Sequence, residues 1–229
     1  MSLLRVEDVH KSYDDLRVLR GITFQMDRGE IKVIIGPSGT GKSTLLNILS
    51  GVDLGYTGGA KVFGRPPSDL SVKKMRGIVF QEHKMDGYLS GREHLLAHGS
   101  FYKIPKKEIE AASTKLLGFM DLKDCANRPV KTYSSGMIRR LEIARALLHK
   151  PKVLLLDEPT SDLDVNIKKK IWQHLKELKA GFNLSVLLAT HDLKEAAELG
   201  DRVIILENGA KKAELSKNQV NEKRLTEMI

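Results

Sequence analysis

The segment 36–44 constrains the fold of this chain more than any other part of its sequence. It fits the phosphate-binding P-loop pattern in full, and it consists of Gly36, Pro37, Ser38, Gly39, Thr40, Gly41, Lys42, Ser43 and Thr44. Apolar runs at 31–35 and 43–50 flank it, which predicts a buried strand, a tight loop and a core helix that ends at Gly51. Glycines let successive backbone N–H groups face phosphates, and the helix adds its positive dipole end. The segment therefore predicts an α/β fold that binds a nucleotide.

A second run, 153–158, places two carboxylates at the end of an apolar strand. The carboxyl end of a buried parallel strand borders the crevice where such sheets bind ligands. We expect Lys42 to reach the β and γ phosphates of ATP, and Ser43 and Asp157 to hold Mg²⁺, the latter through water. Glu158 is then the acid that polarises the attacking water. The alternative is that the two carboxylates simply end a strand.

Three further residues are candidates for the same site. His191 follows the strand 184–190, so it is expected to contact the γ phosphate or to be an ordinary polar strand terminus. Gln81 follows the strand 77–80 and is a candidate for sensing Mg²⁺ and the water. Tyr13 offers an aromatic ring to an adenine face, or packs on the β layer as a turn residue, and spacing alone does not choose.

The segment 133–137 precedes a helix and suggests a second anion site. Ser134 is a good N-cap, which would explain the segment without any ligand. Together with Ser135 and Gly136, however, it forms a small-residue helix start that suits a phosphate. Residues 83–150 are mostly of helical periodicity, and Ser90 with Glu93 forms a capping-box pattern.

These patterns predict one α/β domain with a P-loop nucleoside-triphosphatase core. Its mostly parallel sheet is preceded by an antiparallel β subdomain, expected from apolar runs at 3–9 and 18–24. Residues 1–82 and 151–229 form the nucleotide-binding core, with a helix at 167–179, and residues 83–150 form an inserted helical subdomain.

The charge balance limits the possible partners. The sequence has 38 Lys and Arg against 29 Asp and Glu, a formal net charge of +9. Basic residues occur in scattered pairs and one triplet without interleaved aromatic residues, which favours a solvated surface or proximity to a membrane over nucleic acid. No apolar run approaches the roughly 20 residues of a membrane span, and no secretory signal is visible, so we expect a cytoplasmic chain that is not inserted in a membrane. Cys125 is the single cysteine.

Taken together, the motifs resemble the ATP-binding subunit of ABC (ATP-binding cassette) transporters over nearly the whole chain. The order and spacing of the family match in its Walker A loop GPSGTGKST, Q-loop Gln81, signature YSSGM, Walker B strand VLLLDE, D-loop 161–164 and switch His191. The stretches 89–95, 133–160 and 191–209 look most like the subgroup of drug and polysaccharide exporters.

The resemblance implies a head-to-tail homodimer on ATP binding, in which the signature segment of one copy covers the ATP on the P-loop of the other. It implies that Tyr13 stacks on adenine, Glu158 is the general base, His191 braces the γ phosphate and Asp164 communicates across the dimer. A groove near Gln81 and the helical insertion is expected to receive a cytoplasmic helix of a separate membrane permease, which keeps the chain peripheral on the inner face of the cell membrane.

Two other classes use the same cassette: an adaptor ATPase that regulates a membrane complex without transport, and a soluble ATPase of DNA repair or translation. The chain also departs from the usual signature Leu-Ser-Gly-Gly-Gln, because Ser135 replaces the first glycine and Met137 the glutamine. A side chain at Ser135 is expected to crowd a phosphate or to add a hydroxyl contact. Asp162 adds a negative charge at a D-loop position that is more often small.

Overall fold

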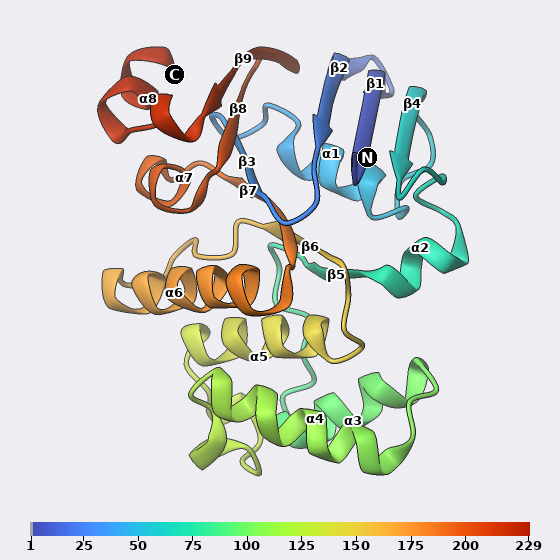
Figure 1. Cartoon of the computed structure of the whole chain (residues 1–229), viewed down its shortest axis with the longest axis vertical. Coiled ribbons are helices and arrows are strands. Elements are labelled where there is room, and N and C mark those ends of the chain that lie inside the picture. Colours follow the sequence, from blue (N-terminus) through green and yellow to red (C-terminus); the bar gives the residue numbers. More distant parts are fainter. Residues whose placement is uncertain (1) are drawn as a thin grey trace.

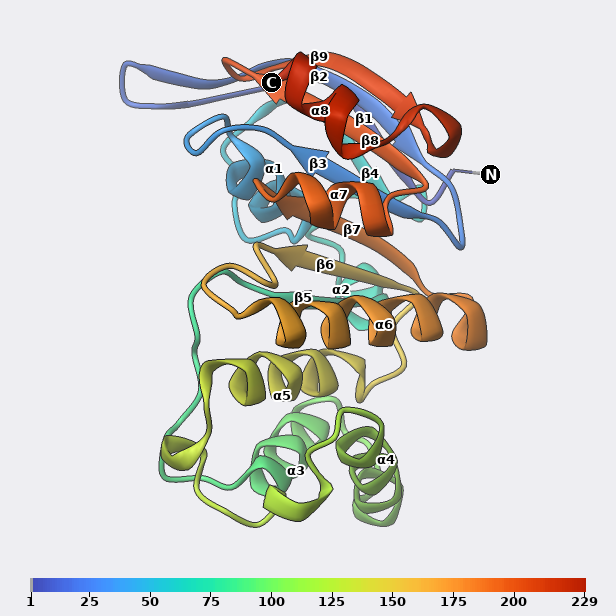
Figure 2. The ribbon, with the colours of Figure 1, turned by 90° about the vertical axis from the view of Figure 1, so that its left-hand side faces the viewer.

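The computed structural model describes residues 2–229, which form two sheets and the helices around them (Figure 1). A three-stranded antiparallel sheet has the order β2-β1-β4. Its strands are β1 (Leu4–Tyr13), β2 (Leu16–Met26) and β4 (Thr57–Val62). This is the antiparallel N-terminal layer that the sequence predicts. The hairpin that joins β1 to β2 extends beyond the rest of the chain (Figure 2).

The second sheet has six strands in the order β5-β6-β7-β3-β8-β9. All neighbours are parallel except β8 and β9, and the strands are β3 (Ile31–Ile35), β5 (Arg76–Val79), β6 (Val153–Asp157), β7 (Ser185–Thr190), β8 (Arg202–Glu207) and β9 (Ala210–Ser216). In register, Asp157 lies opposite Ala189, and Ile35 opposite Thr190. The ends of β3, β6 and β7 therefore meet at one edge of the sheet, as expected for parallel strands.

Helices cover the large sheet and build a second region beside it. The helices are α1 (Lys42–Leu49), α2 (Leu70–Met75), α3 (Gly91–Phe101), α4 (Lys106–Phe119), α5 (Ser135–Leu147), α6 (Val165–Phe182), α7 (Leu193–Leu199) and α8 (Glu222–Met228). In both ribbon views α3, α4 and α5 gather at the end of the molecule away from β1 and β2. Within residues 2–229, none of the helices has the length and apolar character that crossing a bilayer requires.

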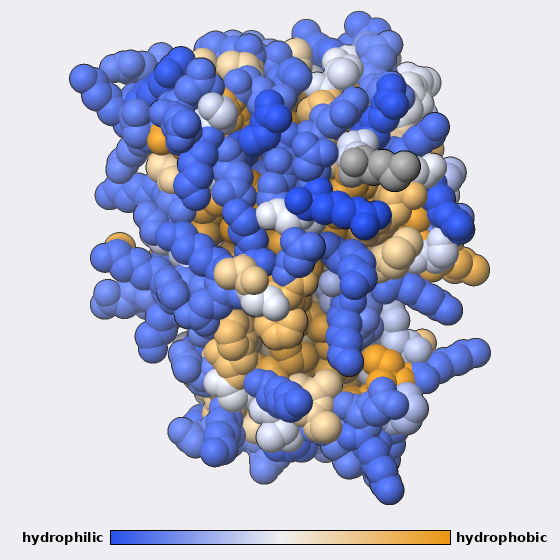
Figure 3. Space-filling view, in the orientation of Figure 1, coloured by the Kyte–Doolittle hydropathy of each residue, from blue (hydrophilic) through white to orange (hydrophobic). Residues whose placement is uncertain are grey.

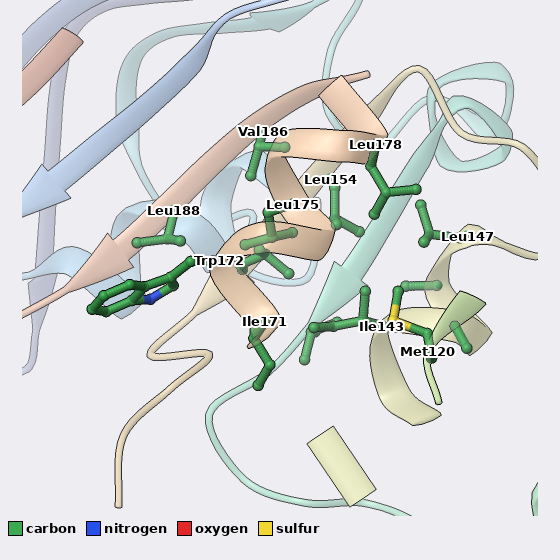
Figure 4. Close-up of a cluster of buried hydrophobic side chains, with 14 of the residues drawn as sticks. Met120, Ile143, Leu147, Leu154, Ile171, Trp172, Leu175, Leu178, Val186 and Leu188 are labelled. Atoms are coloured by element: carbon green, nitrogen blue, oxygen red, sulfur yellow. The ribbon is translucent and has the colours of Figure 1, made fainter. Parts of the chain in front are cut away.

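The helix α6 joins the sheet to the helical region through a shared apolar core. Figure 4 shows side chains from α6 between those of β6 and β7 and those of α5, and it labels Met120, Ile143, Leu147, Leu154, Ile171, Trp172, Leu175, Leu178, Val186 and Leu188. A second cluster packs α1 between the large sheet and the antiparallel sheet. Burial on both faces explains why β6 and β7 are mainly continuous apolar runs rather than alternating ones. The strand β3 is apolar except at the buried Lys32, whose ammonium group pairs with Glu214.

Local signals predicted several element ends correctly. Gly51 follows α1 with a φ of 63°, and Ser90 and Glu93 form a complete capping box at the start of α3. Some predicted bounds were too short, because β1 continues to Tyr13 and α6 runs from Val165 to Phe182. Elements β4, β9 and α8 were not predicted, since their short and mixed sequences carry weak periodicity. The strand β8 was also not predicted, although residues 203–206 are a continuous apolar run.

Most of the face in Figure 3 is polar, but apolar side chains gather there over α5 and α6. A hollow of about 350 Å³ lies between the helical region and the end of α6. Most of its lining is apolar, and three lysines also contribute to it. The lining residues are Ala112, Lys115, Leu116, Leu147, Leu148, Lys150, Pro151, Lys152, Leu178, Phe182 and Leu184.

Candidate nucleotide-binding site

The P-loop, residues 36–44, connects β3 to α1 and is held in a conformation that needs glycine. Gly41 immediately precedes α1 with a φ of 94°, and a Cβ there would lie 2.5 Å from Cδ2 of Leu19. A Cβ on Gly36 would collide with the backbone carbonyl of Leu206. Side chains are thus excluded at these two positions, and the loop can wrap an anion with its backbone N–H groups at the start of α1.

Lys42 places its ammonium group inside the loop rather than in solvent. The side chain is 5% exposed, and Nζ donates hydrogen bonds to the carbonyl oxygens of Gly36 (2.8 Å) and Pro37 (3.0 Å). Its nearest carboxylate is Glu158, with Oε1 at 3.7 Å. Burial lowers the pKa of Lys42, while Glu158 and Asp157 oppose that shift. The amine is fixed at the point where the phosphates of a bound nucleotide would be compensated.

Asp157 and Ser43 lie next to each other at the end of β6 and the start of α1. The Ser43 hydroxyl donates to Oδ1 of Asp157 at 3.1 Å, and Asp157 is 5% exposed. Burial raises the pKa of Asp157, and the charge of Glu158 raises it further, although the Ser43 bond opposes this. A buried carboxylate with a hydroxyl beside it suits Mg²⁺, which binds hard oxygen ligands and keeps several waters. Residues 2–229 contain no group of three or more His, Cys, Asp or Glu arranged to hold a metal, so phosphate and water would complete such a site.

Glu158 and His191 form a direct pair at the same edge. Oε2 of Glu158 lies 2.8 Å from Nδ1 of His191, and the backbone N–H of Glu158 donates to the Ala189 carbonyl of β7. Glu158 has a φ of 47°, in the left-handed region that non-glycine residues seldom adopt, which turns the chain sharply after β6. The Glu158 side chain is 8% exposed and that of His191 56%, so the imidazole faces solvent while it orients the acid.

Gln81 is exposed, and its side chain makes no hydrogen bond within residues 2–229. Its backbone is nevertheless fixed, because the buried guanidinium of Arg139 on α5 donates to the carbonyls of Phe80 (2.7 Å) and Gln81 (2.8 Å). Glu142 accepts from the same guanidinium at 3.0 Å. The loop after β5 is thereby tied to the helical region, while the predicted contact of Gln81 with Mg²⁺ stays a prediction. The sequence interpretation missed Arg139.

Tyr13 ends β1, and the residue is 45% exposed rather than buried in the antiparallel sheet. Its hydroxyl donates to Oδ2 of Asp53 at 2.7 Å. Burial and the bond to Asp53 raise the pKa of Tyr13, and the nearby Thr44 hydroxyl of the P-loop opposes this shift. Tyr13 is thus held beside the phosphate-binding loop with part of its ring open to solvent.

The signature residues lie away from the P-loop of the same chain. Ser134 caps α5 by accepting from the Met137 N–H at 3.3 Å, as predicted, and Ser134 and Ser135 are exposed. Gly136 is buried against α6. A Cβ at this position would lie only 2.7 Å from Cγ2 of Ile167. In both ribbon views α6 and the large sheet's β6 separate α5 from α1. The fold therefore does not bring the two predicted anion sites together within one chain.

The D-loop lies at the start of α6. Asp164 is exposed and caps the helix by accepting from the N–H groups of Asn166 and Ile167, both at 3.0 Å. Asp162 is also exposed and has a φ of 58°. The D-loop is therefore adjacent to the start of α5, through the contact between Gly136 and Ile167.

A buried network behind the site was missed by the sequence interpretation. Glu195 on α7 is fully buried and accepts from the Thr160 hydroxyl (2.8 Å) and from Trp172 Nε1 (2.9 Å). Lys168 on α6 also binds Asp192, which directly follows His191. These contacts tie the segment after His191 to the segment after Glu158. No sequence motif marks a buried acid on a short helix, which is why the network was not found.

Comparisons with known proteins agree with this geometry. The family model described as ABC transporter matches residues 19–161. The chain is 41% identical over 211 residues to the Nod factor export ATP-binding protein I of Rhizobium meliloti (strain 1021), covering 91% of this chain and 63% of that protein. It is 34% identical over 230 residues to the sn-glycerol-3-phosphate import ATP-binding protein UgpC of Paracoccus denitrificans (strain Pd 1222), covering 100% of this chain and 65% of that protein. The chain thus spans less than two thirds of the length of these two relatives.

Solved structures give the same result. The chain resembles cbiO1 from Clostridium perfringens, part of the ABC transporter complex cbiONQ, with a TM-score of 0.87, 28% identity and coverage of 99% of this chain and 93% of that one. It also resembles the ATP-binding cassette MJ0796, solved as a dimer in a post-hydrolysis state with ADP and Pi, with a TM-score of 0.85, 29% identity and coverage of 93% and 98%. A P-loop fold with this site defines an ATP-binding cassette. The chain belongs to the ABC transporter family.

Proposed function

We propose that the chain binds ATP with Mg²⁺ and hydrolyses it as the energy-supplying subunit of a membrane transporter. The observation that carries the proposal is the convergence at one edge of the sheet of Lys42, which begins α1, Glu158, which follows β6, and His191, which follows β7. An acid at a P-loop, with a cation on one side and an imidazole on the other, has the arrangement that phosphoryl transfer to water needs.

The residues have separate roles in this mechanism. Lys42 and the N–H groups of the P-loop compensate the phosphate charge, and Glu158 accepts the proton of the attacking water. His191 holds the Glu158 carboxylate through its Nδ1, and its other ring nitrogen would contact the γ phosphate of bound ATP. Ser43 and Asp157 would hold Mg²⁺, which supplies positive charge as the leaving phosphate develops negative charge.

We further propose that hydrolysis requires a second copy of the chain. The support is the start of α5, where Ser134 and Ser135 are exposed. Figure 2 shows α6 and β6 between α5 and α1, the helix that follows the P-loop. In a head-to-tail homodimer these groups would cover the ATP on the partner, and the exposed Asp164 would lie at the interface. MJ0796, with 29% identity, is a dimer bound to ADP and Pi.

A groove between the core and the helical region supports a permease partner. This hollow of about 460 Å³ lies between the ends of α1 and β5 on one side and α3 and α5 on the other, and Phe80, the residue before Gln81, lines it. We propose that a short cytoplasmic helix of a separate permease docks there and holds the chain at the inner face of the membrane. Relatives include exporters and importers, and we propose export because the relative at 41% identity is an export protein.

The direct test is Glu158→Gln with ATP and Mg²⁺. Hydrolysis should fall by about 10³-fold, the range expected when a general base is lost, while ATP affinity is retained. Glu177→Gln, an exposed change on α6, is the matched control and should leave both unchanged. Unchanged hydrolysis in Glu158→Gln would exclude Glu158 as the base. Transport by vesicles that contain the chain and its permease separates a transporter subunit from a non-transporting adaptor.

A further inference from the structure

The lysine two residues before Tyr13 is buried although it lies near the end of β1. Lys11 is 8% exposed, and its Nζ donates to Oδ1 of Asp53 and to the Gly55 carbonyl, both at 2.8 Å. Asp53 accepts from the Tyr13 hydroxyl with its other oxygen, at 2.7 Å. One carboxylate therefore joins the ammonium group to the phenol.

The same ammonium group lies over the ring of Tyr13. Lys11 Nζ is 4.5 Å from the ring centroid, within the range of a cation–π contact. One face of the ring is thereby occupied, while 45% of the residue stays exposed. The hydroxyl and the covered face fix the ring at two points, so the phenol cannot rotate freely about its side-chain bonds.

Asp53 is itself held by the helix that begins in the P-loop. After α1 ends, the N–H groups of Val52 and Asp53 donate to the carbonyl of Asn47, and the Gly55 N–H donates to Oδ1 of Asp53 at 3.0 Å. Burial alone would raise the pKa of Asp53, but hydrogen bonds from Lys11, Tyr13 and Gly55 outweigh it and lower that pKa. Asp53 is an ionised anchor that connects α1 to Lys11 and Tyr13.

We propose that Lys11 and Asp53 are positioning residues for the nucleobase, which they serve by holding Tyr13 with its open face beside the P-loop. The inference rests on the proposed binding of ATP. A base joined to phosphates on the P-loop stacks on the open face, opposite the Lys11 ammonium group. Because α1 carries the phosphate-binding residues at its start and Asp53 after its end, the phosphate and base halves of the site move as one body.

The test compares ATP with inorganic tripolyphosphate, which has no base, in calorimetric titrations of the full chain with Mg²⁺. Tyr13→Ala should lower the affinity for ATP by about tenfold, the loss expected when base stacking on an aromatic ring is removed. Lys11→Met and Asp53→Asn should each lower the affinity for ATP by about fivefold. This loss is within the range expected for a cation–π contact or for one hydrogen bond to a charged group. None of these changes should alter the affinity for tripolyphosphate. Arg5→Met, an exposed change on β1, is the matched control.

Double variants separate positioning from a general structural role. In a Tyr13→Ala background, Lys11→Met should cause no further loss of ATP affinity, because the ring that Lys11 positions is gone. The proposal would be overturned if Lys11→Met lowered ATP affinity equally with and without the Tyr13 ring. It would also be overturned if Lys11→Met lowered the affinities for ATP and tripolyphosphate equally. If Lys11→Met does not fold, Tyr13→Phe removes only the link to Asp53, and unchanged ATP affinity would then count against positioning. A wild-type chain that binds neither ligand would instead refute the proposed function itself.

Discussion

Two helix N-termini in this chain suit anions, but they are built differently. The start of α1 is enclosed: Lys42 is 5% exposed, and residues from β3, β6 and β7 surround it. The start of α5 is open, with Ser134 and Ser135 exposed and no acidic residue in the first turn of the helix. The first site has its own compensating charges and can bind a polyphosphate alone. The second has only backbone dipoles and hydroxyls, which suits a surface that adds to a ligand already bound elsewhere.

Replacing Lys42 should produce the largest effect on the enclosed site. In Lys42→Ala, ATP affinity should fall by at least about 100-fold, because the phosphates lose a buried charge-assisted partner. The measurement is a calorimetric titration of ATP with Mg²⁺, and Lys169→Ala on α6 is an exposed control. ATP affinity equal to wild type would break the comparison, because the enclosed site would then not be the phosphate site.

Changing the open site should affect hydrolysis but not binding to the single chain. Ser135→Glu adds a negative charge at the first position of α5, where a carboxylate favours the helix, so the fold should be retained. Hydrolysis at high protein concentration should fall by about 100-fold, as when one stabilising group in a transition state is lost. ATP affinity at low protein concentration should stay at the wild-type value. Ser135→Gln is the uncharged control, and a loss equal to that of the Glu variant would show crowding rather than charge.

A smaller effect is expected from replacing Asp157. Burial of its carboxylate lowers the stability of the folded chain when no Mg²⁺ is bound. Its folded pKa lies above the ordinary 3.8, so the cost is present at neutral pH and disappears as the pH falls through the folded value toward 3.8. Asp157→Asn should therefore raise the melting temperature of the nucleotide-free chain at pH 7 by about 3 °C, with a smaller gain near pH 4. It should also weaken the Mg²⁺ dependence of ATP binding. A lower melting temperature at pH 7 would contradict this account.

The smallest effect concerns the network behind the site. Burial raises the pKa of Glu195 above its ordinary 4.5, against the hydrogen bonds from Thr160 and Trp172. Glu195→Gln keeps an acceptor for Thr160 and Trp172 and removes a charge, so it should raise the melting temperature at pH 8 by about 2 °C, with the gain shrinking toward pH 4.5. Trp172 is the only tryptophan, so its fluorescence reports unfolding directly. Glu198→Gln on the exposed side of α7 is the control, and a pH-independent gain would argue against a titrating Glu195.

The start of α1 and the start of α5 also differ in how much of their role the sequence predicts. The P-loop, Asp157 and Glu158 were identified correctly as neighbours, because parallel strands place their carboxyl ends at one edge. Ser134 was predicted as an N-cap from residue type alone, and the structure confirms it. Arg139, Asp53 and Glu195 could not be found, since their importance depends on long-range contacts between elements that no local pattern records. The partner surface of α5 is not tested by a single chain and stays a proposal.

The most direct test of the central claim, that the two sites act together across copies, mixes Lys42→Ala with Ser135→Glu. Each variant alone should be nearly inactive, because every site lacks either the P-loop lysine or an open signature surface. In a mixed dimer one site joins an intact P-loop to an intact signature surface. If copies pair at random, about a quarter of the wild-type ATPase activity should return on mixing. Activity that stays at the sum of the two separate variants would contradict the claim.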